Sequence, residues 1–220
     1  MLNIELHCHT IYSKDSLTTP EEMLKACERK GLDRIAVTDH NTIRGALAVQ
    51  QLDPDKVIIG EEIMTTKGEL LAFFVQEEVP SKLKPEEAIT HLRDQGAFIS
   101  VSHPFDRLRK GHWELDDLLE ILPNVDAIET FNSRCLRSSF NKDAQAFSKQ
   151  HNLQQTVGSD AHAVYELGKA RLIVPEFEDA ESFSEALETA KQEVTLSPFW
   201  VHFYSRYAVW RKKLDPNLVP

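Results

Sequence analysis

The chain has 220 residues, a length that suits one domain burying roughly 70% of its unfolded surface. Its 35 acidic residues outnumber its 25 Lys and Arg, giving a net charge of −10, so it lacks the basic surface needed to bind long nucleic acid. No apolar run reaches the about 18 residues of a membrane span, and no signal segment is visible. Three widely spaced cysteines form no disulfide or zinc pattern. We therefore expect a cytoplasmic protein that binds neither membranes nor long nucleic acid.

Strand-like and helix-like segments alternate along the chain. The apolar run Ile4–His7 is followed by a helix that begins with a capping box at Thr19 and Glu22 and ends at Gly31. The later segments are, in order, Arg34–Thr38, Ile43–Gln51, Val57–Ile59, Leu70–Val75, Pro85–Gln95, Ala97–Val101, Leu115–Leu122, Val125–Glu129, Phe140–His151, Gln155–Val157, Ala170–Val174 and Ala180–Lys191. Repeated βα units favour a mostly parallel sheet, and roughly seven or eight strands in so short a chain favour an irregular barrel.

Histidines and carboxylates gather just after the predicted strands, where parallel α/β folds place their chemistry. These residues are His7, His9, Asp39, His40, Glu61, Glu62, His103, Glu129, Asn132, Asp160 and His162. Any one of these motifs is also explained as packing or as a hydrogen-bonded turn. Together they are costly to assemble unless metal ions pair them. Imidazole and carboxylate without thiolate suit zinc, manganese or iron, and so many ligands imply roughly two to three divalent ions.

The order of the motifs resembles the PHP (polymerase and histidinol phosphatase) family of metal-dependent phosphoesterases. The matching segments are HCHTIYSKDSLTTPEE at 7–22, TDHN at 38–41, GEEI at 60–63, SHP at 102–104, GSDAH at 158–162 and ELG at 166–168. The resemblance implies a single α/β domain, a distorted (β/α)7 barrel, which we assign to residues 1–195. It also implies hydrolysis of a small phosphomonoester or nucleotide by a hydroxide that bridges two metals.

The resemblance further implies which residues bind the metals. Its motifs assign His7, His9, Glu62 and Asp160 to a first metal, Glu62 and His103 to a second, and Asp15, His40 and His162 to a third. The chain departs from the family pattern at Ser16, where glycine is usual. It also has Glu69 near a position where many members have histidine. We assign Glu69 to the second metal, the alternative being a solvated turn residue, and we expect Asp39 to orient a catalytic ligand or water.

Arginines after two of the predicted strands are candidates for binding the phosphoryl oxygens. Arginine recognises phosphate with two parallel hydrogen bonds. Arg107 lies in the loop that follows His103, and Arg134 lies just beyond Asn132. The alternative for each is an ordinary surface ion pair.

Residues 196–220 form an aromatic and basic tail, which we expect to be a helix packed on the barrel. It carries two of the three tryptophans and ends in a basic stretch at 211–213. The alternatives are a homo-oligomer contact or a membrane-surface helix, and the irregular amphipathic pattern disfavours the membrane. For the whole chain, other metal-dependent hydrolysis, such as C–N bond cleavage, and a non-catalytic metal-binding module remain alternatives to phosphoester hydrolysis.

Overall fold

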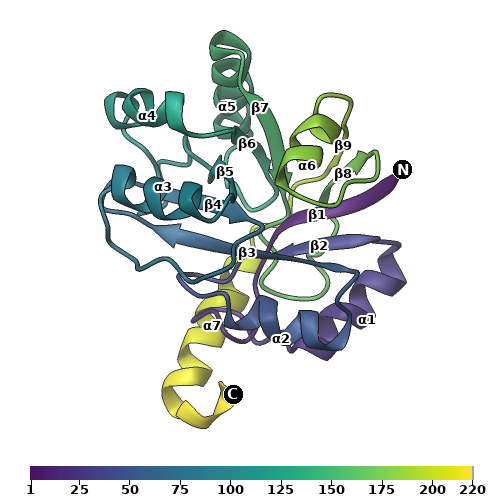
Figure 1. Cartoon of the computed structure of the whole chain (residues 1–220). Coiled ribbons are helices and arrows are strands. Elements are labelled where there is room, and N and C mark those ends of the chain that lie inside the picture. The colour runs from purple at the N-terminus through teal and green to yellow at the C-terminus, as the bar shows by residue number, and fades with distance from the viewer. Residues whose placement is uncertain (220) are drawn as a thin grey trace.

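The strands form one sheet that curls on itself (Figure 1). The computed structural model describes residues 1–219, in which nine strands pair in the order β7-β6-β5-β4-β3-β2-β1-β8-β9. The strands are β1 (Leu2–Cys8), β2 (Arg34–Val37), β3 (Val57–Met64), β4 (Glu69–Phe73), β5 (Phe98–Val101), β6 (Ala127–Asn132), β7 (Gln154–Gly158), β8 (Ala170–Val174) and β9 (Lys191–Val194).

Helices follow most of the strands, as the alternating pattern predicts. They are α1 (Pro20–Lys30), α2 (Arg44–Leu52), α3 (Pro85–Asp94), α4 (Leu115–Ile121), α5 (Ser138–His151), α6 (Ala180–Leu187) and α7 (Val201–Leu214), with 3-10 turns at Leu122–Asn124 and Pro216–Leu218. The predicted capping box of α1 is confirmed, because the Thr19 hydroxyl accepts from Glu22 N and the Glu22 carboxylate accepts from Thr19 N. Gly31 ends the helix with φ +64°, a conformation that glycine adopts without strain.

Strands β1 to β7 make a nearly closed barrel, which confirms the predicted distorted barrel. The runs β1-β2-β3 and β5-β6-β7 are each parallel. The two ends meet where the residues after β7 pair with the end of β1, since His9 N donates to the Ala161 carbonyl at 2.8 Å. The distortion lies at β4, which runs antiparallel to both neighbours because the turn after β3 is too short for a crossover helix.

The core of the barrel is apolar at its floor and polar at its mouth. Ile4, Leu6, Phe73, Phe98 and Leu172 are almost completely buried in one of three apolar clusters. Burying each such side chain stabilises the fold by about 1.5–3 kcal/mol. The carboxyl ends of the parallel strands instead carry buried histidines and carboxylates. The apolar residues of the floor stabilise the strands that position these polar side chains.

The C-terminal part differs from expectation in one element. The sequence predicts a helix from Ala180 to Lys191, but α6 ends at Leu187 and Lys191 begins strand β9. The side chains of β9 are all exposed, so the strand pairs with β8 only through its backbone and leaves no hydrophobic alternation in the sequence.

Within the C-terminal tail, residues 201–214 form helix α7, in which Val201 and Ala208 are buried. Phe199, Phe203 and Trp210 are exposed, and contact with a second copy of the chain stays a prediction. Pro220 lies outside the described residues. None of the helices in the described part of the chain is long and apolar enough to cross a membrane.

Candidate metal centre

Five of the six residues predicted to hold the first two metals meet at the mouth of the barrel. His7 Nε2 lies 3.4 Å from Glu62 Oε1, and His9 Nε2 lies 3.2 Å from Asp160 Oδ1. His103 Nε2 lies 3.0 Å from Glu62 Oε1. All five side chains are buried. The alternation of β1 explains the first pair, because residues two apart on a strand face the same side.

The remaining predicted ligands lie beside this group. Asp15 lies between two imidazoles, with its oxygens 3.6 Å from His40 Nε2 and 3.3 Å from His162 Nε2. Glu69 Oε2 lies 3.5 Å from His103 Nε2. Three ligand groups each have donor atoms within 4.8 Å of one another: His9, His40 and His162; His7, His9 and Glu62; and His40, Glu62 and Glu69. The structure therefore brings all nine predicted ligands into one cluster.

Several atoms of the cluster are buried without a hydrogen-bond partner. They include His7 Nε2, His9 Nε2, Asp15 Oδ1 and Asp160 Oδ1. Leaving a buried polar group unsatisfied costs about 1–3 kcal/mol, so such a group calls for a specific explanation. These imidazole and carboxylate atoms face one another, which is the donor set that zinc, manganese and iron accept. The residues present therefore fit divalent metal ions.

Neighbouring side chains orient the histidines toward the cluster. Glu129 Oε1 lies 2.9 Å from His7 Nδ1, while Glu129 Oε2 accepts from His103 N at 2.8 Å. A proton held on His7 Nδ1 leaves the Nε2 lone pair free for a metal, and carboxylates commonly hold ligating histidines in this way.

A second chain of hydrogen bonds orients His9, and it includes the predicted Asp39. His9 Nδ1 lies 3.1 Å from the Ser13 hydroxyl, which donates to Asp39 Oδ1 at 2.6 Å. Asp39 also accepts from Thr10 N and from the Thr10 hydroxyl. Asp39 thus touches His9 only through Ser13, which is the kind of indirect contact expected of an orienting residue.

The charges in the cluster shift the pKa values of its members. Burial alone would raise the pKa of Glu62, but the imidazoles of His7 and His40 hold it well below its usual range. Burial opposes the charged form of His7, yet Glu62 and Glu129 raise its pKa well above the ordinary value. Burial beside other imidazoles lowers the pKa of His9 to about 3. A metal that binds His7 must therefore displace a proton.

The backbone is strained where it presents two of the ligands. His103 has φ +22° and Asp160 has φ +52°, values that side-chain-bearing residues rarely adopt. Such strain persists where the surrounding fold enforces it, often at functional sites. The backbone also packs closely on a ligand at Gly158, where an added Cβ would lie 2.3 Å from the Cβ of His7.

A cavity of about 440 Å³ opens onto the cluster. The residues that line it include Asp15, His40, Glu69, Arg109 and Arg134. Its volume lies in the range of sites that hold small molecules. The clustered histidines and carboxylates are therefore accessible to a small molecule of that size.

The structure places the two predicted arginines differently. Arg134 is buried in the cavity wall, where its Nη1 lies 2.6 Å from His162 Nδ1 and its Nε lies 3.2 Å from Glu166 Oε2. Arg107 is exposed and lines a separate cavity with Trp113, so the prediction that it lies in the site is corrected. Arg109 takes that place.

Sequence reasoning did not assign an individual role to three residues of the site, although Arg109 lies in the loop after His103 that was a candidate for binding phosphate. Arg109 Nη1 contacts Asp160 Oδ2 at 2.5 Å, and turn hydrogen bonds with Asp106 set its direction, which no periodic pattern reveals. His202 lines the cavity from α7 but is separated from the ligand motifs in the sequence. Glu129 was recognised among the strand-end residues but was not assigned a role, although it follows the same pattern as the ligands.

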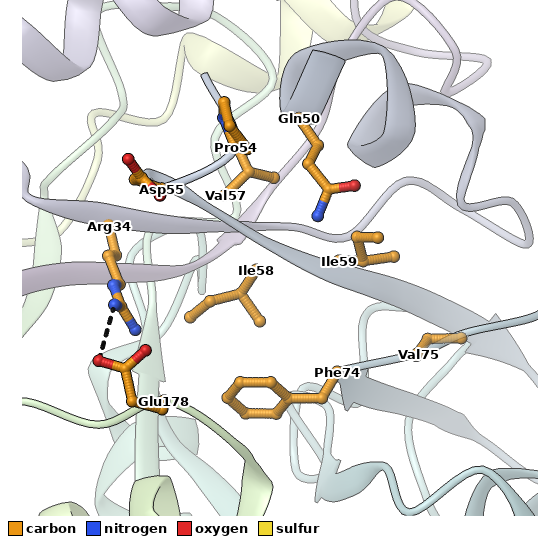
Figure 2. Close-up of a pocket in the computed structure, with 10 residues that line it drawn as sticks. All are labelled: Arg34, Gln50, Pro54, Asp55, Val57, Ile58, Ile59, Phe74, Val75 and Glu178. Atoms are coloured by element: carbon orange, nitrogen blue, oxygen red, sulfur yellow. Dashed lines mark ion pairs between the residues drawn. The ribbon is translucent and has the colours of Figure 1, made fainter. Parts of the chain in front are cut away.

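A second cavity, of about 310 Å³, lies away from this cluster (Figure 2). It is lined by Gln50 of α2, Ile58 of β3 and Phe74 just after β4, and its Arg34 pairs with Glu178 at 3.8 Å. Among the described residues, none of the groups able to hold a metal includes a residue of this cavity. The polar chemistry of the molecule is therefore at the barrel mouth.

The fold and the cluster together define an α/β barrel of the metal-dependent hydrolase class. A model of the PHP domain matches residues 5–194, so the chain belongs to the PHP domain family. An uncharacterized protein of Methanocaldococcus jannaschii is 37% identical over 145 residues, or 60% of this chain and 82% of that protein. A second uncharacterized protein of that organism is 35% identical over 172 residues, which cover 77% of this chain and 69% of that protein.

Solved structures confirm the fold. A two-domain protein of Bacteroides vulgatus, described as containing a predicted PHP-like metal-dependent phosphoesterase, is 20% identical with a TM-score of 0.70 over 88% of this chain and 65% of that one. PsfC from Pseudomonas syringae is 17% identical with a TM-score of 0.69, and the match covers 97% of this chain and 98% of PsfC. Family membership and the His and Glu groups support a metal-dependent hydrolase.

Proposed function

We propose that the protein is a phosphoesterase that hydrolyses a small phosphomonoester or nucleotide with roughly two to three bound Mn, Zn or Fe ions. One observation carries this proposal: Arg134 is buried in the wall of the cavity that contains the clustered ligands. Arginine is a side chain that commonly binds phosphate. Amide hydrolysis would need the metals but has no evident use for an arginine in the wall of the cavity over them.

The nine clustered side chains would hold the ions. When bound, the ions supply an activated water and neutralise charge on the phosphoryl oxygens. Glu129 and Ser13 keep His7 and His9 oriented toward that centre. The positive φ values of His103 and Asp160 support the proposal, because strained backbone is typical of functional sites.

The tautomer of His162 decides what Arg134 can bind. His162 Nδ1 lies 2.6 Å from Arg134 Nη1 and 2.8 Å from the Asp160 carbonyl. If His162 offers Nε2 as a ligand, Nδ1 carries the proton, donates to the Asp160 carbonyl and cannot accept from Arg134. Arg134 Nη1 is then free to donate to a phosphoryl oxygen in the cavity.

The charge of the site is compatible with an anionic substrate. Asp15, Glu62, Glu69 and Asp160 account for much of the negative charge around the mouth, and bound cations would neutralise them. The formal charge of −10 therefore overstates how strongly the working mouth repels a phosphate. A small phosphate ester can enter where a long polyanion gains little from the rest of the surface.

The test is an assay of the manganese-loaded protein, after its metal content is measured, on phosphomonoesters, nucleotides and simple amides. Losing one charge-assisted hydrogen bond costs about 1.5–3 kcal/mol, so we expect Arg134→Ala to lower kcat/KM on a phosphoester about tenfold or more. Arg107→Ala is the matched control and should behave as wild type.

Turnover of amides alone would replace the proposal with C–N bond hydrolysis. A protein that binds metals but turns over no substrate of either kind would indicate a metal-binding module. Equal effects of the two arginine substitutions would show that Arg134 has no special part in binding phosphate.

A further inference from the structure

Helix α7 forms one wall of the cavity over the metal cluster. Arg134 Nη2 donates to the Val201 carbonyl at 2.9 Å and to the Ser205 hydroxyl at 2.8 Å. At the other end of the helix, Lys212 donates to the carbonyls of Ile11 and Ser13, in the loop that carries a predicted ligand. Figure 1 shows α7 starting beside the barrel and extending away from it. The helix is thus fixed to two sides of the site.

This wall is not part of the region that matches the family. The family model ends at residue 194, and α7 begins at Val201. Even so, His202, Ser205 and Arg206 of α7 line the same cavity as the metal cluster. What α7 adds to the cavity is therefore a feature of this chain beyond the matched domain.

Three exposed cations surround the mouth of the cavity. Lys14 comes from the loop after β1, Lys110 from the loop after β5, and Arg206 from α7. Within residues 1–219, none of the three forms an ion pair with a carboxylate. In a chain with 35 acidic residues, unpaired cations on three separate elements at one opening point to an external anion.

The metal centre does not account for these cations. The carboxylates that line the cavity are Asp15 and Glu69, and both belong to the ligand cluster. Once metals neutralise them, no carboxylate in the lining is left to pair with the cations at the mouth. A cavity of about 440 Å³ also has room for more than the group under attack.

We propose that Arg206, with Lys14 and Lys110, binds a second anionic group of the substrate, a carboxylate or a phosphate, separate from the phosphoryl group at the metal centre. This inference rests on the proposed phosphoesterase function. It makes α7 an element of substrate specificity, because Arg134 is held in place by the same helix that presents Arg206.

The experiment measures binding rather than turnover. Manganese-loaded protein is titrated calorimetrically with methylphosphonate, with linear bisphosphonates of increasing chain length, and with phosphonocarboxylates of the same lengths. At least one two-headed probe should bind about tenfold more tightly than methylphosphonate, the gain expected from one charge-assisted contact. The better series identifies the anion, and the preference should weaken as salt screens the exposed cations.

Arg206→Ala should abolish the preference for two-headed probes while leaving the Kd for methylphosphonate unchanged. Lys213→Ala is the matched control, since it removes a charge from the same helix two turns away, outside the cavity lining. A Lys213→Ala protein should keep the preference.

Two results would overturn the inference. One is that no two-headed probe binds more tightly than methylphosphonate, and the other is that Arg206→Ala keeps the preference. If p-nitrophenyl phosphate is hydrolysed in either case, only the second subsite is refuted. If it is not hydrolysed and methylphosphonate does not bind, the proposed phosphoesterase function fails as well.

Discussion

Replacing Glu129 with glutamine tests whether this carboxylate sets the metal affinity of the cluster. Both oxygens of Glu129 accept hydrogen bonds, one beside His7 Nδ1 at 2.9 Å and the other from His103 N at 2.8 Å. Glutamine has one oxygen, so its amide group must face one of these two partners. If the NH2 group faces His7, Nδ1 becomes the acceptor and the proton moves to Nε2, which blocks the lone pair that a metal needs.

The magnitude follows from the role of such partners in other metal sites. Their loss typically costs 10–100-fold in metal affinity, or about 1.4–2.7 kcal/mol. We expect Glu129→Gln to weaken manganese or zinc binding by this factor, measured by competition with a chromophoric chelator. Far-UV circular dichroism of the metal-free protein should show that the fold is retained, so that the change is assigned to the site.

Glu61→Gln is the matched control. Glu61 is also buried and is next to a ligand in the sequence, but its carboxylate accepts from Val79 N at 3.0 Å and contacts none of the clustered histidines. The control should bind metals as wild type does. The reasoning would be refuted if Glu129→Gln kept wild-type affinity, or if both substitutions weakened binding equally.

Two further predictions concern stability. Gly158→Ala should lose about 1–3 kcal/mol of unfolding free energy and bind metal more weakly, because the new Cβ would lie 2.3 Å from the Cβ of His7 and 2.5 Å from Glu129 Oε1; unchanged urea denaturation and metal titration would contradict this. Burial raises the pKa of Glu61 to about 8 in the folded protein. Between about pH 4.5 and 8 the unfolded chain releases this proton while the folded protein keeps it, so the unfolding free energy of the wild type falls as pH rises. Glu61→Gln removes that loss and should become more stable relative to wild type over this range, and a constant difference would refute the assignment.

The meeting of most of the candidate ligands was predictable from short-range rules, whereas their assignment to metals came from the resemblance to the PHP family. The two-residue period of a strand puts His7 and His9 on one face, and parallel strands bring their carboxyl ends to one edge of the barrel. Glu62 lies in β3 and His103 follows β5, two strands that run in the same direction although β4 lies between them. The barrel was predictable for the same reason, since its closure requires only the order and direction of the strands.

The arginine loop was not predictable because its path depends on contacts that are distant in the sequence. Gly111 packs so closely on Glu69 that an added Cβ would lie 1.9 Å from Glu69 Oε2. This contact, with the turn between Asp106 and Arg109, directs Arg109 inward and leaves Arg107 exposed. Both arginines lie in an irregular loop with no periodic pattern, so spacing alone could not distinguish them.

The position of α7 would explain how one barrel mouth can combine the proposed metal centre with selection of a particular substrate. The clustered ligands and Glu129 all lie within the matched region 5–194, and they serve any substrate that brings a suitable group to the metals. Arg206 lies beyond that region yet lines the same cavity. Because Arg134 hydrogen-bonds to α7 through Val201 and Ser205, a shift of the helix would move both the arginine proposed to bind phosphate and the cation at the mouth. Substitution of Arg206 should therefore alter which substrates bind without altering the metal affinity of the cluster.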